Sequence, residues 1–185
     1  MENTFGKYRI AAPIATESSN PAYRARPVTA TEWGYVVKVY NDHKLHSLIA
    51  QEEWRHQMAA LMHLEHPYIL PLIETGIEEE VPYSVTNYME GGSLRDRLNQ
   101  IFPEQLVIQD VKNIILQVGQ ALQYAHDHHI LHGNIKPENI LFNEYDDALL
   151  IDFRLPQDDE ETDHSLPTVI HLMQDSDGMG KLYLL

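Results

Sequence analysis

The chain has 185 residues, enough for one domain or two small lobes, and its 43% hydrophobic content is typical of a folded protein and excludes a disordered one. It has no cysteine, which excludes disulfides, thiolate metal sites and a thiol nucleophile. A formal net charge of −15 argues against nucleic acid and anionic membrane surfaces as partners. Since no segment resembles a signal core or a membrane span, we expect a cytoplasmic protein.

The first half of the chain is predicted to form strands around one helix. Tyr8 and Ile10 open a short strand, and residues 34–40 form a strong one, because β-branched and aromatic residues favour strands. Apolar residues recur at helical spacing over residues 44–63, which predicts a helix. Two further strands are predicted near residues 68–75 and 82–88.

The second half is predicted to be mainly helical. After a Gly-Gly break at 91–92, Ser93 caps a short helix, and the longest helix covers residues 104–128. Two short apolar runs at residues 139–142 and 148–153 predict a hairpin. One face of the long helix is apolar at helical spacing and includes Val111, Ile114, Val118 and Leu122.

Four segments, in this order, resemble motifs of bacterial-type serine/threonine protein kinases. Residues 131–142, LHGNIKPENILF, resemble the catalytic loop H-R-D-L-K-P-x-N-I-L, and residues 152–154, DFR, stand where the family has D-F-G. Residues 35–38, YVVK, resemble the V-A-I-K strand, and residues 89–94, MEGGSL, resemble the segment after the hinge. The resemblance covers about residues 6–155.

The resemblance implies an α+β, protein-kinase-like fold with two lobes. Residues 1–88 are expected to form an N-lobe with a five-stranded antiparallel sheet and one helix. Residues 89–155 are expected to form a partial, mainly helical C-lobe that ends soon after the D-F-G position. Residues 156–185 form an acidic and then apolar tail in this scheme.

Phosphoryl transfer needs a base, a phosphate-binding loop and magnesium ligands, and several of these positions depart from the family pattern. Asn134 stands at the base position, where an amide cannot accept a proton as a carboxylate does, and Gly133 replaces the preceding arginine. Residues 15–20 align with the glycine-rich loop but contain no glycine, and Glu17 would repel phosphate. Arg154 replaces the D-F-G glycine and is expected to pair with the preceding aspartate, in competition with metal or nucleotide.

The remaining positions match the family, and they are the residual candidates for nucleotide binding: Lys38, Lys136, Asn139 and Asp152. Among them, Asn139 and Asp152 are weak candidates for magnesium. The family spacing places Gln57 opposite Lys38, with Glu53 one helical turn earlier as the alternative. No cofactor is expected, although ATP and magnesium with weak affinity remain an alternative. A zinc site among the histidines at 126–132 is disfavoured, because no carboxylate pattern supports it.

These departures predict a catalytically inactive pseudokinase that acts by binding, as a regulator, scaffold or adaptor. Because so little chain follows Asp152, the long-helix face is expected to be only partly covered, which favours a protein partner or a homodimer there. A monomer whose tail covers this face is the alternative. The competing functions are a weak or atypical nucleotide-dependent transferase that uses Lys38, Lys136, Asn139 and Asp152, and a decaying gene fragment.

Overall fold

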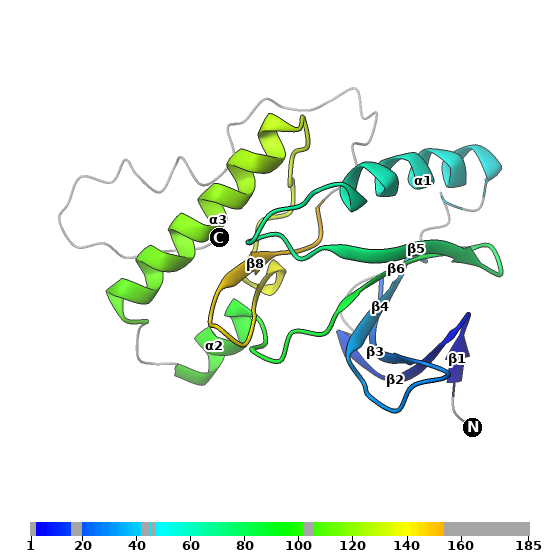
Figure 1. Cartoon of the computed structure of the whole chain (residues 1–185), viewed down its shortest axis with the longest axis horizontal. Coiled ribbons are helices and arrows are strands. Elements are labelled where there is room, and N and C mark those ends of the chain that lie inside the picture. The colour runs from blue at the N-terminus through cyan, green and yellow to red at the C-terminus, as the bar shows by residue number, and fades with distance from the viewer. Residues whose placement is uncertain (1–2, 16–19, 42–44, 46, 102–105, 154–185) are drawn as a thin grey trace.

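The computed structural model describes residues 3–15, 20–41, 45, 47–101 and 106–153, which form a strand-rich lobe and a smaller, mainly helical part (Figure 1). The strand-rich lobe is one antiparallel sheet in the order β1-β2-β3-β4-β6-β5. Its strands are β1 (Asn3–Phe5), β2 (Tyr8–Ala15), β3 (Ala22–Pro27), β4 (Tyr35–Val39), β5 (Leu72–Glu78) and β6 (Val81–Asn87). The sheet has one strand more than predicted, because β1 turns at Gly6, with φ +53°, and pairs with β2.

The sheet curls so that β2 comes into contact with the edge strand β5. Tyr8 of β2 donates a hydrogen bond of 2.9 Å to Oε2 of Glu74 on β5, and Tyr83 donates one of 3.0 Å to Oε1 of the same carboxylate. Inside the curl lies an apolar core whose buried members are Tyr8, Ala25, Val37, Val39, Tyr83 and Val85. Because side chains alternate along a strand, the neighbours of these core residues point to the opposite face, where Lys38 lies.

Helix α1 (Leu48–Met62) packs beside this sheet. It begins at Ser47, whose hydroxyl oxygen accepts a hydrogen bond of 3.1 Å from the Ala50 N–H and so satisfies one of the free donors of the first turn. Trp54 and Met58 are buried, at 1% and 2% exposure, and anchor the helix. The predicted helix over residues 44–63 is therefore present, with its described part starting at Leu48.

The second part of the structure contains α2 (Leu94–Ile101), α3 (Ile108–Asp127), the short 3-10 helix η2 (Pro137–Asn139) and a hairpin of β7 (Ile140–Phe142) and β8 (Ala148–Leu150). Ser93 and Asp96 cap α2 reciprocally: the Asp96 N–H donates to the Ser93 hydroxyl at 3.1 Å, and the Ser93 N–H donates to the Asp96 carboxylate at 2.9 Å. The core of this part joins α3 to the hairpin through Val118, Ala121, Ala125, Ile140, Phe142 and Leu150.

The apolar face predicted on α3 is partly buried. Val118 is buried, and Ile114 and Leu122 are partly buried against the core formed with the hairpin. The reason is that β8 packs directly along this helix. The exposed apolar side chains of α3 lie next to this face instead, at Ile108, Ile115 and Leu116, with 66%, 48% and 63% exposure.

Backbone hydrogen bonds tie the two parts together along β8. Residues 68–70 were predicted to open a strand that continues to residue 75, but the strand β5 begins only at Leu72. The Leu70 N–H donates to the Leu150 carbonyl and the Leu150 N–H donates to the Tyr68 carbonyl, both at 2.9 Å. The segment between α1 and β5 therefore pairs with the outer side of β8 over a short stretch of backbone.

No helix among the described residues is both long and apolar enough to cross a membrane.

Candidate functional site

A buried histidine anchors the loop before η2. His132 is 1% exposed, its Nε2 lies 2.9 Å from the Ile151 carbonyl oxygen, and its Nδ1 accepts a hydrogen bond of 3.2 Å from the Asn134 N–H. These two bonds assign the proton to Nε2 and require a neutral ring. Burial lowers the pKa of His132, which fits the same state. His132 thereby fixes the loop against the segment that leads to Asp152.

Asn139 holds the loop from its other side. It is 4% exposed, and its Nδ2 donates a hydrogen bond of 2.7 Å to the Asn134 carbonyl oxygen. The Ile151 N–H donates to the Asn139 carbonyl at 3.0 Å, so η2 and the end of the hairpin are joined. The amide oxygen of Asn139 is the atom of this side chain that could bind a metal.

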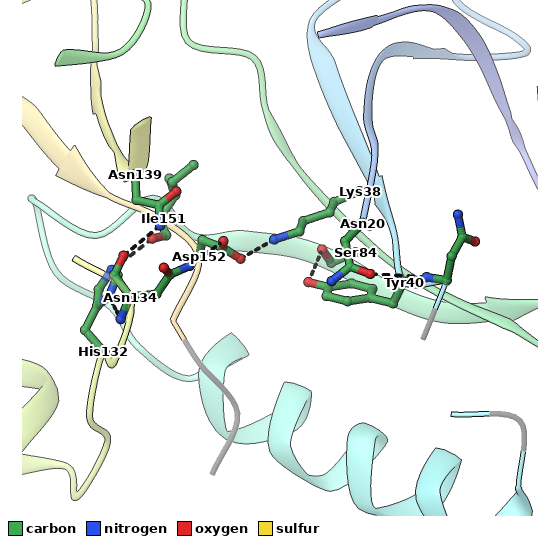
Figure 2. A network of polar contacts seen from close by, with 10 residues as sticks. Asn20, Lys38, Tyr40, Ser84, His132, Asn134, Asn139, Ile151 and Asp152 are labelled. Carbon is green, nitrogen blue, oxygen red and sulfur yellow. Dashed lines mark hydrogen bonds and ion pairs between the residues drawn. The ribbon is translucent and has the colours of Figure 1, made fainter. Parts of the chain in front are cut away.

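Asp152 lies at the centre of the site, in the left-handed backbone region with φ +65° (Figure 2). Its Oδ1 forms an ion pair with the Lys38 ammonium of β4, and its Oδ2 accepts a hydrogen bond of 3.0 Å from Nδ2 of Asn134. Lys38 and Asp152 are 25% and 26% exposed, so water still reaches the pair. The structure therefore brings together Lys38, Asn134, Asn139 and Asp152, which sequence motifs alone had selected.

An aromatic side chain that sequence reasoning missed lies beside Lys38. The Lys38 Nζ is 5.4 Å from the centre of the Tyr40 ring, and the Tyr40 hydroxyl is 3.1 Å from the Ser84 hydroxyl. The Tyr40 ring also meets the Trp54 ring of α1 edge-on, with 5.6 Å between the centres. The two-residue period of a strand places residues 38 and 40 on one face, so the proximity of Tyr40 to Lys38 could have been predicted from the sequence.

Other predicted positions are placed differently. Lys136 is exposed, and its backbone carbonyl accepts from the Asn139 N–H at 2.9 Å. Gly133 has φ +64°, a conformation in which an arginine would be strained, so the glycine fits the local backbone. On α1, Gln57 is partly buried and Glu53 is exposed. Glu17 and Arg154 lie outside the described residues.

The arrangement around Asp152 does not suit a divalent cation as it stands. Each carboxylate oxygen already accepts from a protein donor, and the Lys38 ammonium lies against Oδ1. A magnesium ion on Asp152 would meet that ammonium at short range, where like charges repel strongly. Among the described residues, no group of three or more histidine, cysteine or acidic side chains is placed to hold a metal ion.

Comparison with known proteins identifies the family of this chain. The model of the protein kinase domain family matches residues 23–170. Calcium-dependent protein kinase 6 of Plasmodium berghei is 34% identical over 126 residues, which are 66% of this chain and 8% of that protein. The probable serine/threonine-protein kinase PknB of Lactococcus lactis is 26% identical over 156 residues, which are 84% of this chain and 25% of that protein.

Solved structures give the same fold. The crystal structure of the Mycobacterium tuberculosis PknI kinase domain superposes with a TM-score of 0.70 at 22% identity, over 84% of this chain and 63% of that domain. The chain therefore spans less than two thirds of the kinase domain it superposes on, and a quarter of the Lactococcus lactis relative. On the family match, the fold and the catalytic-loop geometry together, the chain belongs to the protein kinase domain family.

Proposed function

We propose that this kinase-like chain is catalytically inactive and acts by binding, as a regulator, scaffold or adaptor. One observation carries the proposal: the base position is an amide that donates to Asp152. An aspartate at position 134 would instead place two carboxylates in contact at this distance. Asn134 therefore suits a site that is closed and balanced in charge without a metal ion, and it does not suit proton abstraction.

The charges of the site support the same reading. Lys38 and Asp152 neutralise each other, and Asn134 satisfies the second carboxylate oxygen without adding charge. In phosphoryl transfer, the same lysine and aspartate must be available to phosphate and metal. Nucleotide binding would have to break an ion pair and a hydrogen bond that the chain already makes, so it is expected to be weak.

For binding to a partner, we propose the strip of α3 beside its packed face. Ile108, Ile115 and Leu116 are exposed, and Leu122 continues the strip while partly buried. Ile114 and Val118 of the predicted face pack in the core with the hairpin, and Val111 is partly buried. The partner is a protein or a second copy of this chain, since exposed aliphatic side chains on a regular helix suit an apolar protein surface.

The test measures transfer and binding together. Purified chain is incubated with γ-labelled ATP and either magnesium or manganese, with and without a generic basic acceptor protein. Thermal unfolding is measured in parallel with and without magnesium-ATP, since a ligand of the native state raises the melting temperature. We expect no transfer above background, and at most a small thermal shift.

The transferase alternative makes the opposite prediction. It uses Lys38, Lys136, Asn139 and Asp152, and the buried, oriented Asn139 is the observation that favours it. Transfer by the unmodified chain that disappears in both Lys38→Ala and Asp152→Ala would establish it and would refute inactivity. Lys112→Ala, an exposed change on α3, is the matched control and should leave either outcome unchanged.

A further inference from the structure

The helix beside the Lys38 ammonium brings no charge at the expected position. The family pattern implies a helix carboxylate opposite the strand lysine, but position 57 is a glutamine and Glu53 is exposed. We propose that Tyr40 is a positioning residue, whose ring, backed by Trp54 of α1, directs the Lys38 ammonium toward Asp152 through a cation–π interaction.

The geometry meets the requirements of such an interaction. A separation of 5.4 Å between Nζ and the ring centre falls inside the roughly 6 Å range in which an ammonium is attracted to an aromatic face. The Tyr40 ring lies on the side of Lys38 nearer α1, whereas Asp152 lies on its other side (Figure 2). The ammonium thus has a carboxylate before it and a π face beside it.

Two further contacts hold the ring in this place. The Tyr40 hydroxyl shares a hydrogen bond of 3.1 Å with Ser84, which lies next to β4 on β6 and pairs with Lys38 in register. The Trp54 ring meets the Tyr40 ring at an interplanar angle of 64°, the edge-to-face arrangement that aromatic pairs prefer. Burial raises the pKa of Tyr40 to about 12, so the phenol stays neutral and does not compete with Asp152 for Lys38.

This arrangement links the position of α1 to the ion pair without a charge on the helix. Trp54 is 1% exposed, so α1 cannot slide or rotate without moving the ring that it touches. A shift of Tyr40 removes the π face from Lys38 and loosens its contact with Asp152. The inference concerns the same site as the proposed function, but it concerns lysine placement and not phosphoryl transfer.

The test separates the electronic role of the ring from its shape. Phenylalanine and 3,4,5-trifluorophenylalanine are incorporated at position 40, because they are nearly equal in size but fluorine depletes the π face of electrons. The fold is then titrated with urea in two backgrounds, one with Lys38 and one with the uncharged Lys38→Met. With Lys38, fluorination should lower the folding equilibrium constant roughly 2- to 5-fold more than it does in the Met background.

A merely structural ring would give a different result. If position 40 only fills space, fluorination changes stability equally in both backgrounds, and that outcome overturns the proposal. Lys38→Gln serves as a second uncharged background should the Met variant not fold. Fluorination at Phe5, whose ring packs on Tyr83 in the apolar core inside the curled sheet, is the control. It should give no difference between the Lys38 and Met backgrounds. Phosphate transfer by the chain would refute inactivity but would leave this comparison untouched.

Discussion

Replacing Asn134 by aspartate tests whether the site depends on an uncharged hydrogen-bond donor beside Asp152. In the structure, Nδ2 of Asn134 lies 3.0 Å from Oδ2 of Asp152. Asn134→Asp turns this donor into an oxygen with negative charge. For two unit charges at this distance, Coulomb's law gives about 5.5 kcal/mol at an effective dielectric constant of about 20, and about 1.4 kcal/mol in water. Because Asp152 is a quarter exposed and Lys38 offsets part of the repulsion, we expect Asn134→Asp to lower the free energy of unfolding by about 1–3 kcal/mol.

The assay is urea unfolding of the variants at neutral and acidic pH. Asn134→Ala loses the hydrogen bond without adding charge, so the difference between the aspartate and alanine variants isolates the repulsion. That difference should shrink as the pH falls toward about 4, because protonation removes one of the two charges. Asn113→Asp, an exposed site on α3, is the matched control and should change stability little. Equal stability of the aspartate and alanine variants at pH 7 would refute the reasoning.

Two more predictions concern packing and pH. Gly91→Ala should lower the free energy of unfolding in urea by roughly 1–3 kcal/mol, because its Cβ would lie 2.5 Å from the Phe142 carbonyl oxygen. Gly119→Ala has open space around it and should raise that free energy by roughly 0.5–1 kcal/mol, since alanine favours the helix α3. Equal effects of the two substitutions would contradict this prediction. Since the folded state lowers the pKa of His132, the unfolded chain takes up the proton first, and the stability of the fold should fall as the pH drops below 6.5. His132→Phe should weaken this pH dependence of the unfolding free energy. An unchanged dependence in the variant would contradict the prediction.

The sequence was sufficient for the fold class and for four polar residues that the structure brings together, but not for Tyr40 beside them. Catalytic-loop and D-F-G spacing identified Asn134, Asn139 and Asp152, and the strand motif identified Lys38, because a short motif fixes its local backbone. The helices were also found, since their apolar residues recur with the helical period. These features depend on local chain geometry, which a sequence pattern describes well.

Features that depend on distant contacts were harder to predict. Nothing in the pattern of residues 68–70 indicates that their backbone pairs with β8 and not with the sheet, because both choices look like a strand. The element that packs on α3 could not be derived from the sequence either, because helical periodicity identifies the apolar face but not that β8 covers part of it. The partners of Asp152 depend on how closely the two parts of the chain approach, which motif spacing does not contain.

The pairing of residues 68–70 with β8 also affects how the site can open. Asp152 follows β8 by two residues, and β8 is hydrogen-bonded both to β7 and to the segment between α1 and β5. Ile69 is buried in the core that joins α3 to the hairpin, and Tyr68 packs against that core, so the segment before β5 belongs structurally with β8. A movement of the strand-rich lobe relative to the hairpin can therefore leave these backbone bonds intact while it separates Lys38 from Asp152.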